Sequence, residues 1–256
     1  MKRKVLVIGI GAGNPEHMTV QAIGALNRAS VLFIPDKGAD KNDLQRVRRE
    51  ICERFIGKPG YRMVDFDVPE RRQSLPAYRD NIEVWRDKVE AVYERLLTDE
   101  LQEDEWGAFL VWGDPSIYDG TLRILDHLRA SGRLEIECEV IPGISSVQAL
   151  AASHRVALNR IGQSILLTTG RRLKQGLPQG AENVVVMLDG DSALKSADPD
   201  LHIHWAAYAG MPEEILVSGR LGDVVEEIEW RKAEARARHG WIMDSYLLTR
   251  ASDGEE

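Results

Sequence analysis

The sequence predicts an α/β fold made of two domains, with a mostly parallel sheet in the first domain and a mixed sheet in the second. In the first half of the chain, short apolar runs alternate with segments of helical length. Strands joined by such connections form parallel sheets with right-handed crossovers. The second half has more apolar runs per residue, which favours some antiparallel pairing. We therefore expect one domain over residues 1–153 and another over residues 163–256, with residues 153–162 as the junction.

The first domain is expected to hold five strands connected by helices. The strands are expected at residues 5–8, 31–34, 61–68, 107–112 and 135–141. The helices are expected at residues 15–29, 41–55, 79–97, 122–129 and 144–152. Asn14 is expected to cap the first helix, because an asparagine before a proline at the first helical position favours a helix start.

The second domain repeats the alternation with shorter spacing. Strands are expected at residues 165–168, 183–188, 202–208, 215–219 and 241–248, and a helix at residues 221–238. The last residues, 252–256, are polar and are expected to form a frayed tail.

Composition and charge exclude several classes of protein. The chain has 256 residues, of which 43% are hydrophobic and 29% charged, as in a soluble globular protein. Its net charge of −8 argues against general nucleic-acid binding, and no run approaches the length of a membrane span. Cys52 and Cys138 have no metal-type spacing, so we expect no metal site and a reducing, cytoplasmic location.

Three of the expected strands end in turns that expose the backbone. Residues 5–8 run into Gly9-Ile-Gly-Ala-Gly13, residues 107–112 into Gly113-Asp-Pro115, and residues 135–141 into Pro142-Gly-Ile-Ser-Ser146. In an open α/β sheet, ligands bind just beyond the carboxyl ends of the strands. The three turns therefore predict one shared ligand crevice.

Each turn also has a simpler interpretation. The glycines at 9, 11 and 13 resemble a dinucleotide fingerprint, but the position of its third glycine holds Asn14, so a tight turn or another nucleotide-like ligand remains open. Asp114 is expected to accept local backbone hydrogen bonds, and a catalytic role is the alternative. Ser145 and Ser146 could cap the following helix, bind a ligand there, or do both.

Taken together, the runs at residues 7–19, 112–118 and 141–146 resemble the signatures of the tetrapyrrole methylases. These are S-adenosylmethionine-dependent enzymes of sirohaem and cobalamin synthesis. Five further runs resemble one branch of the family, which belongs to the aerobic cobalamin pathway; they are residues 110–119, 158–162, 168–172, 186–190 and 240–244. The resemblance covers nearly the whole chain in order.

The resemblance implies a homodimer that holds S-adenosylmethionine between its two domains and releases S-adenosylhomocysteine. It further implies methylation of C1 of precorrin-5, with the acetyl group lost as acetate. The residues that match cofactor contacts are Gly11, Ala12, Trp112, Gly113, Asp114, Ile117, Ser145, Ser146, Met187, Ala209 and Gly210. Trp112 departs from the pattern, because many relatives have glycine there, and Asp36 lies one residue away from an acid proposed as a base in other members.

Loss of the acetyl group requires a base or a positioned water, together with a donor for the developing oxyanion. The candidates by residue type are Asp36, Asp114, Tyr118 and His154, and no spacing selects among them. His154 also suits a structural role, because a helix dipole favours histidine at the C-terminus.

Arginine side chains are the expected ligands of the substrate's many carboxylates. We favour Arg71 with Arg72, and Arg171 with Arg172, with solvated surface as the alternative. Arg46, Arg48 and Arg49 are interpreted as one exposed face of a helix.

Three other functions are open at this stage. They are a nicotinamide-dependent reductase that uses the first glycine turn, a precorrin methyltransferase of another ring position, and a tetrapyrrole-binding protein without catalytic activity.

Overall fold

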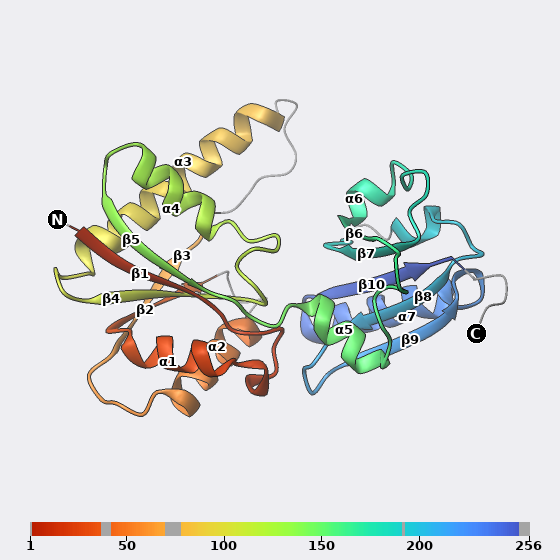
Figure 1. Cartoon of the computed structure of the whole chain (residues 1–256), viewed down its shortest axis with the longest axis horizontal. Helices are drawn as coiled ribbons and strands as arrows, with labels where there is room; N and C mark the ends of the chain where they lie inside the picture. Colours follow the sequence, from red (N-terminus) through yellow and green to blue (C-terminus); the bar gives the residue numbers. More distant parts are fainter. Residues whose placement is uncertain (1, 37–41, 70–77, 191–192, 251–256) are drawn as a thin grey trace. The chain divides into compact units, whose positions relative to one another are not determined.

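The computed structural model describes residues 2–36, 42–69, 78–190 and 193–250, and the chain forms two compact units (Figure 1). The first unit consists of Met1–Gly11 with Pro15–Ile144, and the second of Ala12–Asn14 with Ser145–Glu256. Within the described ranges, we find no helix whose length and hydrophobicity would allow it to cross a membrane.

The first unit is built on a five-stranded parallel sheet with the strand order β3-β2-β4-β1-β5. Its strands are β1 (Lys2–Gly9), β2 (Val31–Asp36), β3 (Arg62–Asp67), β4 (Trp106–Val111) and β5 (Glu135–Ile141). The five expected strands and their parallel pairing are confirmed. In β1, Val5 to Ile8 are completely buried, as expected for a strand covered on both faces.

Four helices cover the two faces of this sheet (Figure 1). They are α1 (Val20–Arg28), α2 (Asn42–Phe55), α3 (Tyr78–Asp99) and α4 (Thr121–Ala130). The pair α3 and α4 packs over an aromatic core in which the Tyr93 and Phe109 rings stack with their centroids 4.6 Å apart. Both rings also line a cavity near the carboxyl ends of β2, β3 and β4.

The start of α1 differs from the sequence prediction. Residues 15–17 form a short 3-10 turn (η1, Pro15–His17), and the α-helix begins only at Val20. Thr19, rather than Asn14, is the N-cap, and its hydroxyl accepts a hydrogen bond of 3.0 Å from the Ala22 N–H. Thr19 supplies the side-chain oxygen that satisfies a free N–H at the helix start, which the predicted cap could not do from five residues upstream.

The second unit contains a mixed five-stranded sheet with the order β6-β7-β10-β8-β9, which confirms the expected class. Its elements are α5 (Ser146–His154), β6 (Ile165–Thr169), α6 (Gly170–Leu173), β7 (Asn183–Met187), η3 (Ala193–Ser196), β8 (His202–Ala207), β9 (Ile215–Arg220), α7 (Leu221–His239) and β10 (Asp244–Thr249). Strands β6 and β7 are parallel, and the other neighbouring pairs are antiparallel.

The contacts divide the chain at residues 144 and 145, earlier than the junction expected at residues 153–162. The reason is that α5 packs on the second sheet. Val147 and Leu150 of this helix are buried in one core with Val185, Ala206 and Leu247.

A buried polar network fixes the centre of the second unit. Lys232 of α7 forms an ion pair with Asp244 at 3.0 Å, and both side chains are only 5% exposed. The Trp205 Nε1–H donates to Asp244, while the Tyr246 hydroxyl donates to Asp189 at 2.8 Å. Burial raises the pKa of Asp244 and of Tyr246. Two of the runs that carry the family resemblance, residues 186–190 and 240–244, therefore supply residues of this network.

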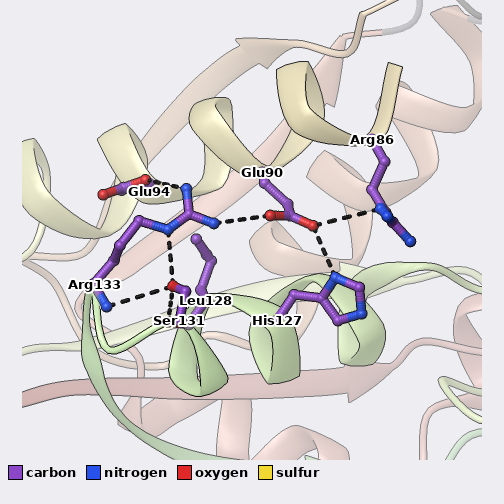
Figure 2. Close-up of polar contacts among 7 residues, drawn as sticks. All are labelled: Arg86, Glu90, Glu94, His127, Leu128, Ser131 and Arg133. Carbon is purple, nitrogen blue, oxygen red and sulfur yellow. Dashed lines mark hydrogen bonds and ion pairs between the residues drawn. The ribbon is translucent and has the colours of Figure 1, made fainter. Parts of the chain in front are cut away.

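In the first unit, a buried carboxylate connects α3 to α4 (Figure 2). Glu90 is 5% exposed; it accepts a hydrogen bond of 2.9 Å from Arg133 and lies 3.0 Å from the His127 Nδ1. Arg86 approaches the same carboxylate at 3.9 Å. Glu94, one turn along α3, also pairs with Arg133, but it lies closer to solvent.

We predict that Glu90→Ala lowers the free energy of unfolding by about 2 kcal/mol, because charged hydrogen bonds to a buried group are lost. Glu94 lies on the same helix and pairs with the same arginine, Arg133. Glu94→Ala should lower the free energy of unfolding by less than about 1 kcal/mol, because this ion pair is more exposed. Urea unfolding of both variants measures the difference. Equal losses would contradict a special role for the buried carboxylate.

Candidate functional site

The carboxyl ends of β1, β4 and β5 meet at three glycines with almost no space between their backbones. A Cβ added at Gly143 would lie 2.1 Å from the Gly113 carbonyl oxygen, and one added at Gly9 would lie 2.6 Å from the Gly143 nitrogen. Side chains cannot occupy such distances, so these positions require glycine. The arrangement brings together the three turns that the sequence singled out.

Gly11 and Gly113 form a short antiparallel bridge across the first two turns. The Gly113 N–H donates to the Gly11 carbonyl at 2.8 Å, and the Ile10 N–H donates to the Val111 carbonyl at 2.9 Å. Gly11 has φ +84° and Gly113 has φ +68°, a region that glycine adopts without strain. The tight turn that the sequence predicted around Gly11 is therefore present in the structure.

Asp114 ties the second turn to the third. Its Oδ2 accepts a hydrogen bond of 2.9 Å from the Gly143 N–H, and its Oδ1 accepts one of 2.8 Å from the Ser116 N–H. Partial burial acts to raise the pKa of Asp114, but the hydrogen bonds from Ser116 and Gly143 outweigh it and hold the pKa below its ordinary value. The carboxylate thus orders the loop, as the sequence analysis expected of a turn aspartate.

The second unit holds the other predicted cofactor residues. Ala12 and Ala209 are buried in one cluster, and Met187 packs against it. Ser145 is the N-cap of α5, and its hydroxyl accepts a hydrogen bond from the Val147 N–H while Gln148 completes the capping box. Ser146 is the first residue of α5, so the capping interpretation applies to Ser145.

The remaining predicted residues lie near turns of each unit. Ile117 donates its N–H to the Asp114 carbonyl, and Tyr118, with φ 51°, is an exposed residue of the same loop. The Gly210 N–H donates to Glu214 at 2.7 Å in the turn after β8.

The predicted catalytic and substrate residues come from both units. Asp36 ends β2 in the first unit, whereas His154 ends α5 in the second, where it forms a 2.9 Å hydrogen bond with the Trp205 carbonyl. Arg171 and Arg172 are exposed on α6. Arg71 and Arg72 lie outside the described residues.

Arg48 was misassigned by the sequence analysis. It is 5% exposed rather than part of a solvated face, and its Nε donates to the Leu110 carbonyl at 3.1 Å. The apolar residues Leu44, Val47 and Ile51 of α2 are also buried. Their spacing from Arg48 places it on the same face of the helix. This spacing is the feature of the sequence that could have predicted the burial of Arg48.

Arg48 borders a cavity of about 210 Å³ at the carboxyl ends of β2, β3 and β4. The aromatic residues Phe33, Phe66, Tyr93, Phe109 and Trp112 form much of its wall, together with Asp119. The second unit has a larger cavity of about 410 Å³, which no predicted site residue lines. Within the described residues, no group of acidic, histidine or cysteine side chains is arranged to hold a metal ion.

Comparison with known proteins identifies the family. Residues 4–225 match the model of the Tetrapyrrole (Corrin/Porphyrin) Methylases, and the chain therefore belongs to this family. It is 50% identical over 255 residues to the precorrin-6A synthase [deacetylating] of Sinorhizobium sp., covering 99% of this chain and 98% of that protein.

Solved structures agree with this assignment. A cobalamin synthesis related protein (CobF) from Corynebacterium diphtheriae is 34% identical with a TM-score of 0.84, covering 98% of this chain and all of that one. A uroporphyrin-III C-methyltransferase from Thermus thermophilus, complexed with S-adenosylhomocysteine, shares the fold at 20% identity and a TM-score of 0.59 over 96% of this chain and 92% of its own.

We predict that Gly143→Ala destabilises the first unit by about 1–3 kcal/mol, because its Cβ has to displace the backbone of the Gly113 loop. Gly24→Ala is the matched control. It lies in α1 with nothing within 4 Å of the added Cβ, and should stabilise the protein by about 0.5–1 kcal/mol. Thermal unfolding of the two variants measures both effects, and a neutral Gly143→Ala would contradict the close crossing.

Proposed function

We propose that the protein is an S-adenosylmethionine-dependent C-methyltransferase. It would methylate C1 of precorrin-5 and release the acetyl group as acetate, giving precorrin-6A. The observation that carries this proposal is the 50% identity to a precorrin-6A synthase [deacetylating] over nearly the full length of both chains.

The turns at the strand ends fit the proposed cofactor. Close backbone approach leaves no room for side chains at Gly9 and Gly143, which crowd against each other and against the Gly113 carbonyl. S-adenosylmethionine supplies a methyl group that is already activated as part of a sulfonium. The protein therefore mainly has to hold and align the reactants, and to exclude water. Backbone-lined turns suit this task because they introduce no competing nucleophile.

We propose the cofactor contacts at the positions carried over from the family. In the first unit these are Gly11, Trp112, Gly113, Asp114 and Ile117. In the second unit they are Ala12, Ser145, Ser146, Met187, Ala209 and Gly210. For Asp114 we propose a positioning role, because both of its carboxylate oxygens accept hydrogen bonds from the loop. Asp36, Tyr118 and His154 remain proposed by residue type, and His154 already has the Trp205 carbonyl as a partner.

Further parts of the proposal are less direct. The family implies a homodimer, while the composition and charge of the chain support a cytoplasmic location with no nucleic-acid or membrane partner. We also propose that Arg71, Arg72, Arg171 and Arg172 bind substrate carboxylates; the exposure of Arg171 and Arg172 is compatible with this role.

Calorimetric titration with S-adenosylhomocysteine, with NADH in parallel, tests the cofactor class. We predict saturable binding of the first near one per chain and none of the second. Binding of NADH alone would contradict a methyltransferase and favour a reductase. Incubation with precorrin-5 and S-adenosylmethionine should then release S-adenosylhomocysteine over many turnovers, whereas a protein that only binds tetrapyrroles would release none.

We predict that Asp114→Ala weakens S-adenosylhomocysteine binding about 10-fold or more, because the loss of one charge-assisted hydrogen bond costs roughly 1.5–3 kcal/mol. Turnover at saturating cofactor should fall much less. Asp114→Asn is the matched variant, since it keeps one acceptor oxygen. Its affinity for S-adenosylhomocysteine should lie between the affinities of the wild type and of Asp114→Ala. Wild-type affinity with a large loss of turnover would instead make Asp114 a catalytic residue.

A further inference from the structure

The cavity beside Arg48 contains a charge that is buried without an ion-pair partner in the described part of the chain. The Arg48 Nε and Nη1 donate to the carbonyls of Leu110 and Leu44, both at 3.1 Å, and no hydrogen bond of Nη2 is found there. Burial lowers the pKa of Arg48 to about 10, so the guanidinium is still charged at neutral pH. Burying a charge without a full set of partners is costly, and a structural arginine would normally be paired.

A second unused donor belongs to another residue of the cavity wall. The Nε1–H of Trp112 is buried and has no hydrogen-bond partner among the described residues. Trp112 lines the cavity, and its ring centroid lies 6.0 Å from the Arg48 guanidinium carbon. Two residues with an unused N–H donor thus line one cavity whose other walls are largely aromatic.

Asp119 adds a carboxylate to this cavity. Its Oδ1 accepts a hydrogen bond of 2.7 Å from the Thr121 N–H, and no described group donates to its Oδ2. Burial has the largest effect on the pKa of Arg48 and lowers it, whereas the negative charge of Asp119 acts to raise that pKa. A ligand that already carried a negative charge would be repelled by Asp119. A neutral carbonyl group would not, and it becomes anionic only when it is attacked.

The size and the lining of the cavity fit a small acyl group. A water molecule takes up about 30 Å³ in the liquid, so a cavity of about 210 Å³ can hold an acetyl group and a water. The aromatic rings of Phe33, Phe66 and Phe109 would contact the methyl group, while the two N–H donors would face the oxygen.

We propose that this cavity receives the acetyl group of the substrate and that Arg48, Trp112 and Asp119 carry out its removal. This inference rests on the proposed function, and it names the residues of the deacetylation, which the sequence analysis did not find. Arg48 and Trp112 stabilise the oxyanion, and Asp119 is the general base.

The step balances with water as its only co-reactant. Asp119 takes a proton from water while the water oxygen forms a bond to the acetyl carbon, and the carbonyl π electrons move to the oxygen held by Arg48 and Trp112. When the C=O bond forms again, the bond between the acetyl carbon and C1 breaks. Its electron pair remains on C1, where it is the nucleophile that methylation requires. Acetic acid leaves and ionises to acetate.

Two variants and a control test the residues in the whole protein. Trp112→Phe keeps an aromatic ring but removes the N–H together with part of the indole, and we expect acetate release to fall about 10²-fold, as for the loss of one oxyanion donor. Asp119→Asn keeps an Oδ1 acceptor for Thr121 but removes the base, and should lower acetate release about 10²-fold or more. The control is Arg49→Met, on the same helix as Arg48, which removes an exposed ion pair with Asp65 and a hydrogen bond to the Met63 Sδ, and should leave the rate unchanged. Calorimetry with S-adenosylhomocysteine should give wild-type affinity for Asp119→Asn and Arg49→Met, and acetate release by Trp112→Phe is compared at saturating S-adenosylmethionine.

A binding measurement separates a failure of this inference from a failure of the proposed function. Acetamide carries a neutral acetyl group, and it should shift the Trp112 indole signal in a ¹⁵N–¹H spectrum, assigned by its loss in Trp112→Phe. Arg48→Met should abolish the shift. If the wild type consumes precorrin-5 but the Trp112 and Asp119 variants release acetate at the wild-type rate, or if acetamide leaves the indole signal unmoved, the inference is overturned. If acetamide binds but the wild type releases neither acetate nor S-adenosylhomocysteine, the proposed function fails, while the acyl-binding cavity is supported.

Discussion

Three backbone segments of the first unit come very close together at Gly9, Gly113 and Gly143, where a Cβ on Gly143 would lie 2.1 Å from a carbonyl oxygen. This crossing determines how the carboxyl ends of β1, β4 and β5 are arranged. It also directs the turns that follow, because Gly11 pairs with Gly113, and Asp114 accepts the Gly143 N–H. A single set of backbone contacts thus forms the part of the site that we assign to the cofactor.

The neighbouring strands β2, β3 and β4 end at a different kind of site. There the aromatic core under α3 opens into a cavity lined by the buried Arg48 and by Trp112, whose indole N–H has no hydrogen-bond partner among the described residues. Methyl transfer from an activated donor needs alignment, whereas removal of an acyl group needs a base and oxyanion donors. The two adjoining regions of the sheet edge differ in the same way. The region at the glycine turns consists mainly of backbone, which suits alignment, and the Arg48 cavity contains charged and polar side chains, which suit removal of an acyl group.

The fold could be predicted from the sequence because the spacing of the apolar residues and the turn residues between them indicate the same helices and strands. Each expected strand is present, and the apolar run at residues 5–8 became the fully buried centre of β1. The start of α1 was wrong, since Thr19 rather than Asn14 provides the cap. The boundary between the two units at residue 144 could not be predicted from composition, because it depends on the sheet against which α5 packs.

The glycine turns were found in advance because a turn at a strand end has a recognisable local pattern. The Arg48 cavity was not, because its residues come from three helices (α2, α3 and α4), three strands and the loop before α4, and only the folded chain brings them together. Arg48 was grouped with exposed arginines although Leu44 and Ile51 mark its helix face as buried. Charge alone was a poor guide there, and helical spacing was the better one.

A crystal structure of the protein with S-adenosylhomocysteine tests the central claim most directly. The account predicts density for this ligand against the backbone of the turns at Gly11 and Gly113, with Asp114 still accepting the Gly143 N–H and the Arg48 cavity left for the acyl group. Density for the ligand inside the Arg48 cavity, or at a distance from the glycine turns, would contradict it.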